Sequence, residues 1–510
     1  MIERRLSYRS RLIYRLLLPY RWAILGFVVL SFVAIILEGI AIAMLLPLMA
    51  VLMPVDTAFG ADSALLQSIT QTVHDLGLVE TWHIGTLVIV LTLAKGLLTF
   101  AVLVSAVWLR NHFQRSLQLI LTDRYTRADY EYLAHQNMGM LIDLFVRRSD
   151  HASGVFMATL LLLNSITATT IYFGMMIGVS WFLSLVVIVA GLGVTVVNSW
   201  AVRIARRSGL EAAEEEAVVA SMAHGLLAGA RIIRSFGLEA QEQDRGKVLQ
   251  DKIYSRRKRK AAARQITRPV TETALILGLV ALVVVTAEIS GSASFASLAI
   301  LAVILIRMMP HIAAINQQRA LIASEFVYVE HVSEILRDTE VSKLPNGDLK
   351  FHTLQQGLRF EGVNFSYSGR NEPALHDITV EIPIGKVTAI VGPSGSGKST
   401  LLDLILRLYD PTSGFIDADG HNLKDLDIYS WRNRIGMVDQ DGFLFNETIR
   451  DNIAYGNLGA TAADIESALD QVQAYDFINE LPNGLDTVVG DRGVLLSGGQ
   501  QQRLTIARAI

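Results

Sequence analysis

The chain has 510 residues, of which 51% are hydrophobic and only 18% are charged, and its mean hydropathy is +0.39. This length predicts more than one domain, and the composition is that of a membrane protein averaged with a soluble part. The sequence holds no cysteine, which excludes disulfides and thiolate metal sites. The formal net charge of −3 excludes little, because the charges are segregated along the chain.

Six helices are predicted to cross a membrane, from five apolar stretches, since a bilayer core needs about 20 apolar residues per helix. The third and fourth come from one long stretch that breaks around residues 178–180, which predicts a tight helical hairpin. The predicted spans are residues 21–53, 84–109, two within 155–200, 270–289 and 295–315.

The distribution of Lys and Arg predicts the orientation of these spans. Residues 1–21 and the long connections 110–154 and 201–269 are rich in Arg and Lys, whereas residues 54–82 contain neither. Both termini and both long connections are therefore expected in the cytoplasm. The basic run 256–260 either binds anionic lipid headgroups or is a solvated helix face, and the second interpretation is favoured.

Two further features belong to the membrane part. Apolar residues at helical spacing from Leu65 to Leu76 predict an amphipathic helix at the outer membrane surface, with a soluble cap as the alternative. Ionisable residues inside spans are costly and often functional. Glu38, Lys95 and Arg307 lie in the first, second and sixth spans. Either Glu38 pairs with Lys95, or Lys95 and Arg307 meet an anionic cargo headgroup; interhelical pairing or snorkelling is the alternative for each.

A soluble α/β domain is predicted where short β-rich runs begin, near Lys350. This divides the chain into a membrane domain with long cytoplasmic helices over residues 1–340, a linker over 341–350 and the soluble domain over 351–510. Strands are predicted at residues 358–360, 378–382 and 387–391.

A phosphate-binding loop is predicted directly after the third of these strands. The run matches GxxxxGK[ST] and leads into a helical stretch, the context in which this pattern binds phosphate. Its glycines let backbone N–H groups wrap phosphates, its lysine reaches the β- and γ-phosphates, and its serine hydroxyl ligates Mg²⁺. A plain glycine-rich turn is the disfavoured alternative. The residues are Gly392, Pro393, Ser394, Gly395, Ser396, Gly397, Lys398, Ser399 and Thr400.

A second helix start follows about a hundred residues later, at Ser497-Gly498-Gly499-Gln500. Ser497 is predicted to cap the helix, and the two glycines permit close approach of an anion to the backbone.

These motifs together resemble the ATP-binding cassette exporters, of the half-transporter kind with six spans followed by one P-loop nucleotide-binding domain. The resemblance covers essentially the whole chain, and the first span, with Leu37-Glu38-Gly39-Ile40, resembles the bacterial lipid-linked oligosaccharide flippase and lipid exporter group. It implies that Tyr367 stacks on adenine and that Gln440 contacts Mg²⁺ and the attacking water. It also implies that residues 490–493 form the exporter X-loop and that Leu496 to Gln500 form the signature motif.

The resemblance further implies ATP and Mg²⁺ as cofactors and a head-to-tail pair of nucleotide domains, so that a homodimer is the default and a heterodimer the alternative. Residues 131–136 and 226–242 resemble the segments that transmit closure of the nucleotide domains to the spans. The implied function is ATP-driven export or flipping of a glycolipid, lipid-linked saccharide or lipid across the bacterial inner membrane. Alternatives are a multidrug or peptide exporter, and an ATP-binding subunit that does not hydrolyse. A cassette protein acting in regulation or DNA repair is disfavoured by the six spans.

One part of the family pattern is not found in the sequence. An apolar strand ending in Asp-Glu (the Walker B strand), a D-loop and a switch histidine are expected after the signature helix, and none occurs up to Ile510. Lys398 and Gln440 are then the implied catalytic residues that are present. The expectation is a C-terminally truncated form of a longer protein that binds ATP poorly and hydrolyses it negligibly; a native binding-only form is the alternative.

Overall fold

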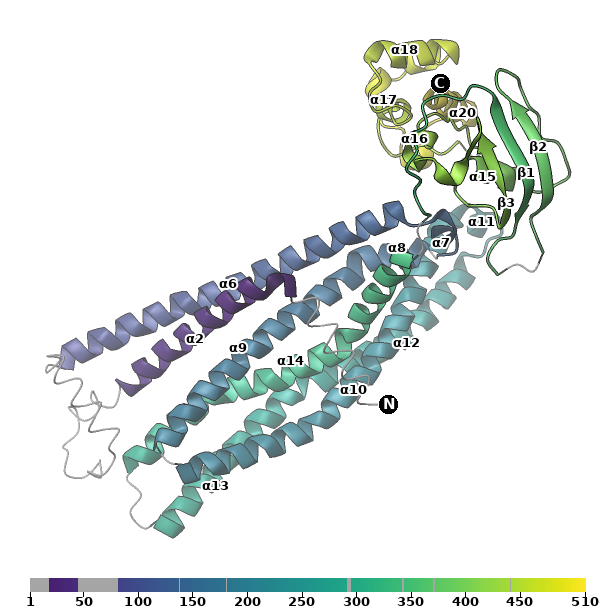
Figure 1. The fold of residues 1–510 in the computed structure, drawn as a ribbon. Coiled ribbons are helices and arrows are strands. Elements are labelled where there is room, and N and C mark those ends of the chain that lie inside the picture. The colour runs from purple at the N-terminus through teal and green to yellow at the C-terminus, as the bar shows by residue number, and fades with distance from the viewer. Residues whose placement is uncertain are drawn as a thin grey trace. The chain divides into compact units, whose positions relative to one another are not determined.

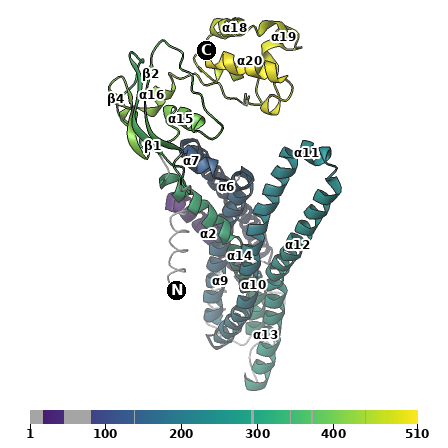
Figure 2. The same ribbon diagram turned by 90° about the vertical axis from the view of Figure 1, so that its right-hand side faces the viewer.

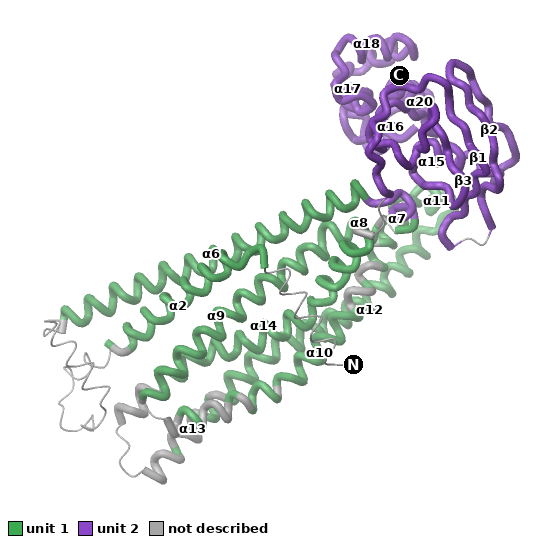
Figure 3. The backbone as a smooth tube through the Cα atoms, viewed as in Figure 1, with its two compact units in different colours: residues 1–127, 135–341 green, residues 128–134, 342–510 purple. Residues whose placement is uncertain are grey.

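The structure is a computed structural model, and it describes residues 18–44, 81–136, 138–179, 181–290, 295–341, 344–369, 372–440 and 442–510. The chain divides into two compact units, drawn in green and purple in Figure 3. Unit 1 comprises residues 1–127 and 135–341, and unit 2 comprises residues 128–134 and 342–510.

Unit 1 is built from long helices that pack side by side (Figure 1). The long helices are α2 (Arg21–Ala43), α6 (Thr81–Arg127), α9 (Ser149–Val179), α10 (Trp181–Ala228), α12 (Glu239–Gln265), α13 (Thr267–Ser290) and α14 (Phe295–Val341). Short helical segments complete the described part: η1 (Leu18–Tyr20), α8 (Met138–Asp143), the π-helical turn η2 (Leu144–Arg148) and α11 (Ala230–Ser235).

The positions of the helices agree with most of the predicted spans. Three stretches of the described residues are long and apolar enough to cross a membrane: Leu18–Ile42, Trp82–Arg127 and Gly139–Gly178. The other predicted spans lie within α10, α13 and α14, where a number of side chains fall outside the described set. The predicted break at 178–180 is confirmed, because α9 ends at Val179 and α10 begins at Trp181. The predicted surface helix at 65–76 lies outside the described residues.

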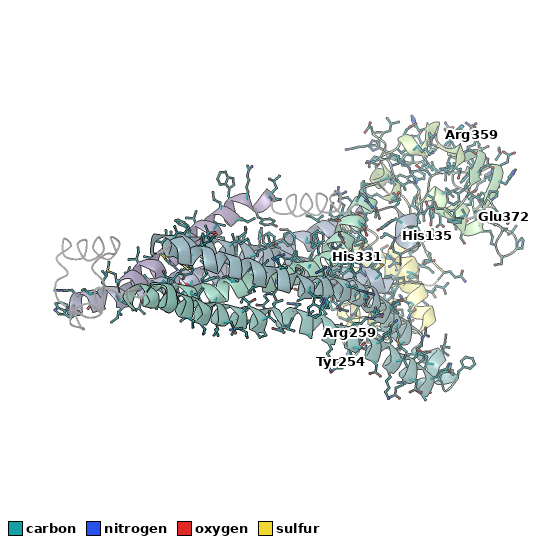
Figure 4. All side chains as sticks on the ribbon, turned by 90° about the horizontal axis from the view of Figure 1, so that it is seen from below. His135, Tyr254, Arg259, His331, Arg359 and Glu372 are labelled. Carbon is teal, nitrogen blue, oxygen red and sulfur yellow. The ribbon has the colours of Figure 1, made fainter. Side chains whose placement is uncertain are left out.

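Both apolar and charged contacts hold unit 1 together. Phe113 of α6 and Phe156 of α9 stack with their ring centroids 4.7 Å apart and an interplanar angle of 3°. A charged residue is buried in the same unit: Arg148 is 1% exposed, and its Nε donates to Asp143 Oδ2 at 2.9 Å. Its Nη1 lies 2.9 Å from Nδ1 of His331, a residue of α14 labelled in Figure 4. A buried arginine needs such partners, so this group ties η2 to α14.

Unit 2 contains a four-stranded antiparallel sheet (Figure 2), in which the strand order is β2-β1-β3-β4. Its strands are β1 (Gly357–Phe365), β2 (Leu375–Pro383), β3 (Ser413–Ala418) and β4 (His421–Asn422). Phe360 pairs with Val380 on one side and with Ile416 on the other, and its side chain is fully buried. The predicted strands at 358–360 and 378–382 are therefore confirmed.

The C-terminal helices of unit 2 build a second apolar core, separate from the core that packs on the sheet. This core includes Leu444, Ile449, Leu469, Val489 and Leu504, each fully buried. Helices α17 (Ile449–Ala454), α18 (Ala462–Gln471), α19 (Tyr475–Asn479) and α20 (Gly498–Ala509) contribute to this core. The other helical segments of unit 2 are α7 (Tyr130–Ala134), α15 (Lys398–Ile405) and α16 (Ile428–Arg432), with the 3-10 turns η3 (Leu423–Asp425), η4 (Gly484–Asp486) and η5 (Asp491–Gly493).

The predicted strand at 387–391 is wrong for this structure. The segment has no regular secondary structure, Val387 is fully exposed and Val391 is 88% exposed. A segment rich in β-branched residues becomes a strand only where a neighbouring backbone pairs with it, and no described residue does so here. The sheet of unit 2 is consequently antiparallel throughout the described residues.

Candidate functional site

The predicted phosphate-binding loop forms an irregular turn that leads into α15. Gly395 and Gly397 have φ angles of +81° and +86°, which side-chain-bearing residues rarely adopt. A Cβ at Gly397 would lie 2.6 Å from Leu375 Cδ2 and 2.7 Å from Ala374 O, so only glycine fits there. A Cβ at Gly395 would meet no atom within 4 Å, so the loop has open space at its centre.

The ammonium group of Lys398 closes over this loop. Its Nζ donates to Gly392 O at 3.0 Å and to Pro393 O at 2.8 Å. Lys398 is also the first residue of α15, whose N-terminus offers unpaired N–H groups and a positive dipole end. The loop, the helix start and the cation thus fit a polyphosphate, which would offer the ammonium a charged acceptor in place of the two carbonyl oxygens.

Tyr367 lies beside the start of α15 and is held from two sides. Its hydroxyl is 3.0 Å from Thr400 Oγ1, and either atom can donate. Its ring meets Phe365 edge-on at 4.9 Å and Tyr409 edge-on at 5.4 Å. In the structure, the predicted adenine-stacking residue therefore lies next to the predicted phosphate site. Their spacing in the sequence does not by itself predict this proximity.

Gln440 is not linked by hydrogen bonds to the phosphate-binding residues in the described part of the chain. Its backbone N–H is bonded to Asp439 Oδ1 at 2.8 Å, and within the described residues no hydrogen bond joins its side chain to Lys398 or Ser399. Burial, and then the charge of Asp439, raise the pKa of the Asp403 carboxyl in α15 above its ordinary value. Ser399 is exposed, which fits a hydroxyl that ligates Mg²⁺ together with phosphate oxygens.

The signature segment forms the N-terminus of α20, and Ser497 caps it as predicted. Gln500 N donates to Ser497 Oγ at 3.4 Å and Ser497 N donates to Gln500 Oε1 at 2.8 Å, which is a capping box. A Cβ at Gly498 or Gly499 would meet nothing within 4 Å, so both glycines face open space. Among the described residues, no hydrogen bond joins this helix start to the phosphate-binding loop of the same chain.

The predicted X-loop is fastened to the same helix. Gln501 Nε2 donates to Gly493 O at 2.7 Å and to Leu496 O at 3.3 Å. Gly490 and Gly493 both have positive φ, and a Cβ at Gly493 would lie 3.1 Å from Leu444 Cδ1. The X-loop and the signature helix thus form one structural element.

Residues 128–134 pack within unit 2, where they reach the surroundings of Tyr367. Glu131 Oε1 accepts from Ser368 N at 2.9 Å, and the Tyr130 ring meets Tyr409 edge-on at 5.9 Å. Tyr409 is the residue whose ring also contacts Tyr367. Tyr130, the residue before the first predicted transmission segment, is therefore one aromatic ring away from the predicted adenine site, and Glu131 of that segment bonds to the residue after Tyr367.

The three ionisable residues that the sequence analysis selected within the predicted spans form one cluster. Glu38 Oε2 lies 3.2 Å from Lys95 Nζ, and Glu38 Oε1 lies 3.2 Å from Arg307 Nη1. The cluster joins α2, α6 and α14. The Glu38 side chain is 12% exposed, whereas those of Lys95 and Arg307 are 29% and 54% exposed. With all three ionised, the cluster carries one excess positive charge next to accessible space.

The basic run at 256–260 makes ion pairs inside unit 1. Arg256 Nη1 lies 3.1 Å from Glu215 Oε1, and Lys260 Nζ lies 3.0 Å from Glu325 Oε1. Arg259 of the same helix is exposed (Figure 4). The inward-facing members of the run therefore join α12 to α10 and α14, and neither of the two interpretations of the sequence included this use.

The sequence did not predict a role for Arg407. It directly follows the cap residue of α15, its side chain is 1% exposed, and its φ is +51°. An isolated arginine after a helix carries no recognisable signal. The only hint is that α15 ends without the glycine that usually takes the left-handed conformation after a helix.

Comparison with known proteins gives consistent similarities over the whole chain. Residues 28–311 match the family described as ABC transporter transmembrane region, and residues 375–510 match the family described as ABC transporter. A protein of Nostoc sp. named heterocyst differentiation ATP-binding protein HepA is 34% identical over 406 residues, which are 78% of this chain and 67% of that protein.

Several relatives share one name. The ATP-dependent lipid A-core flippase of Thiobacillus denitrificans is 30% identical over 82% of this chain and 72% of that protein. That of Ralstonia nicotianae is 30% identical over 84% of this chain and 74% of that protein. Among solved structures, a bacterial Atm1-family ABC exporter with ATP bound superposes with a TM-score of 0.77 at 22% identity, covering 97% of this chain and 83% of that one. This last similarity shows the fold, that of an exporter with a helical membrane region followed by a nucleotide-binding domain.

Proposed function

Because the chain belongs to the ABC transporter family, we propose that it is the half-transporter part of an ATP-driven lipid or glycolipid exporter of the bacterial inner membrane. The observation that supports ATP as the energy source is the glycine-rich loop before α15. It has open space at Gly395, and the Lys398 ammonium bonds to its carbonyl oxygens. The relatives named lipid A-core flippases support a lipid as cargo.

The roles of the chain's own residues follow from this proposal. Lys398 and the N–H groups at the start of α15 bind the phosphates, and Tyr367 stacks on the base. ATP brings Mg²⁺ with it; Ser399 and Gln440 are the protein ligands we assign to that ion, which usually takes few ligands from the protein. Ser497, Gly498, Gly499 and Gln500 present a second anion-binding surface. Positioning and charge stabilisation are the main contributions of protein groups to phosphoryl transfer.

A second copy of the chain is the partner we propose, with a related half-transporter as the alternative. The resemblance implies that a nucleotide lies between the phosphate-binding loop of one copy and the signature helix of the other, and in the described residues no hydrogen bond joins these two segments within one chain. Exposed apolar residues of the second transmission segment are consistent with a contact to another chain: Ile232 is 62% exposed and Phe236 is 74% exposed.

We assign the cluster of Glu38, Lys95 and Arg307 to the cargo headgroup. One excess positive charge fits one anionic group, such as a phosphate of a lipid or of a lipid-linked saccharide. Lys95 and Arg307 are the accessible cations, and Glu38 neutralises part of their charge and holds them together.

We also propose that both termini lie in the cytoplasm, because the positive-inside rule favours that orientation.

Reconstitution tests the cargo assignment. The full-length gene product is placed in vesicles with or without an anionic glycolipid, and its ATPase rate is measured. We expect the glycolipid to stimulate the rate, and the double substitution Lys95→Ala, Arg307→Ala to lose the stimulation while basal hydrolysis remains. Arg268→Ala, which breaks an exposed ion pair with Glu272, serves as the control and keeps the stimulation. Stimulation by DNA and not by lipid would contradict the transporter proposal itself.

A further inference from the structure

The C-terminus of α15 is built around an arginine in a place that favours glycine. Leu408 N donates to Asp403 O at 2.9 Å and Arg407 N donates to Leu404 O at 3.0 Å, which is the hydrogen-bond pattern that ends a helix in a left-handed residue. Arg407 is that residue, with φ of +51°. Such a conformation persists in a residue with a side chain only where the surroundings impose it. The side chain of Arg407 supplies the reason.

The buried guanidinium of Arg407 connects α15 to the segment that precedes the sheet. Nη2 donates to Pro345 O at 2.6 Å, Nη1 donates to Leu426 O at 3.1 Å, and Nε lies 3.2 Å from Asp410 Oδ1. Each of its three nitrogens thus has an acceptor, which is the use for which the planar fork of arginine is suited. Lysine at this position would reach fewer of these groups.

Residues 344–349, the linker that follows α14 in the chain, are fastened along their length. Asn346 Oδ1 accepts from Ile428 N at 2.8 Å, and Asn346 Nδ2 donates to Asp427 Oδ2 at 2.7 Å. Gly347 N donates to Leu426 O, and Leu349 N donates to Asp425 O. Leu344 N donates to the Asp129 carboxylate of the segment 128–134. The linker is therefore a fixed part of unit 2.

We propose that Arg407 is a positioning residue that couples the phosphate-binding helix to this linker, through the contact of its guanidinium with Pro345 O. α15 begins at Lys398, the residue assigned to the phosphates, and ends at the contact with the linker. A displacement of α15 on nucleotide binding therefore moves residues 344–349 through the Arg407 contact. It also moves Asp129, because Leu344 is bonded to the Asp129 carboxylate. The inference rests on the nucleotide site of the proposed function but not on the nature of the cargo.

Hydrogen exchange measured by mass spectrometry tests this coupling in the full-length protein, with and without Mg²⁺ and a non-hydrolysable ATP analogue. In the unsubstituted protein, the analogue is expected to slow exchange both in peptides covering 398–406 and in peptides covering 344–349. In Arg407→Gln, protection of 398–406 remains, whereas the effect of the analogue on 344–349 falls about fivefold or more. A residue that only stabilised unit 2 would change both peptides alike.

Two further variants keep the test decisive. Asn346→Ala removes two hydrogen bonds of the linker, one exposed and one partly buried, without touching α15, and it is expected to reduce the response of 344–349 while the protein stays folded. Arg434→Gln, at an exposed arginine of the same region, is the control and keeps both responses. An undiminished linker response in Arg407→Gln would overturn the inference, whatever the response in Asn346→Ala. Absence of protection at 398–406 in the unsubstituted protein would contradict nucleotide binding itself, and the inference with it.

Discussion

At the scale of single residues, Tyr367 is the most exacting test of the nucleotide site. Its ring is positioned by Phe365 and Tyr409, and its hydroxyl by Thr400. Stacking of a base on an aromatic ring contributes about 1–3 kcal/mol, so Tyr367→Ala is expected to weaken ATP binding roughly tenfold. Tyr367→Phe keeps the ring and is expected to bind nearly as well. Titration with a fluorescent ATP analogue measures both; equal losses in the two variants would refute the stacking role.

Glu325 provides a residue-scale prediction outside the nucleotide site. Burial raises its pKa, but the hydrogen bond from His151 and the charge of Lys260 outweigh burial and lower the pKa to about 2. A carboxyl whose pKa is depressed on folding stabilises the folded state above its unfolded pKa of about 4.5, and this contribution is lost as the pH falls toward 2. Glu325→Gln should therefore lower the melting temperature at neutral pH.

The pH dependence separates this effect from simple loss of packing. The difference in melting temperature between the unsubstituted protein and Glu325→Gln is expected to shrink as the pH falls below about 4.5. Thermal scans by intrinsic fluorescence across this range provide the measurement. A difference that does not change down to pH 3 would show that the charge of Glu325 contributes nothing to stability.

At the scale of elements, two helices carry the same cap and only one is assigned to the nucleotide. Ser497 with Gln500 caps α20, and Thr461 with Asp464 caps α18. Removing either cap hydroxyl is expected to lower the free energy of unfolding by about 1 kcal/mol. Only Ser497→Ala is expected to reduce ATP hydrolysis by the full-length protein as well. Thr461→Ala is the matched control, and equal activity of the two variants would remove Ser497 from the site.

The elements also show how far the sequence alone can lead. The helix boundary near 178–180, the strands β1 and β2 and the cap at Ser497 follow from local patterns, because periodicity and capping residues act within a few positions. The segment 387–391 has an equally strong β pattern but is not a strand, because pairing depends on a distant backbone. Sequence motifs identified the residues of the phosphate loop, whereas its link through Arg407 to Pro345 depends on tertiary contacts.

At the scale of the whole molecule, charged side chains hold together helices that are far apart in the sequence. Glu38 joins α2 to α6 and α14, and Glu325 joins α14 to α9 and α12. The sequence allowed the pairing of Glu38 with Lys95 as one alternative, and the structure contains it along with the Arg307 contact. It gave no reason to connect Glu325 with Lys260, because these residues are 65 positions apart on different helices.

The central claim is that ATP bound at Lys398 drives lipid across a membrane, and the most direct test is transport by the full-length protein in proteoliposomes that contain a fluorescent anionic glycolipid. The proposed function predicts that ATP with Mg²⁺ moves the glycolipid from one leaflet to the other, and that Lys398→Ala abolishes this movement while the protein remains folded. ATP-dependent movement that is unchanged in Lys398→Ala, or ATP hydrolysis without any movement of lipid, would contradict the claim.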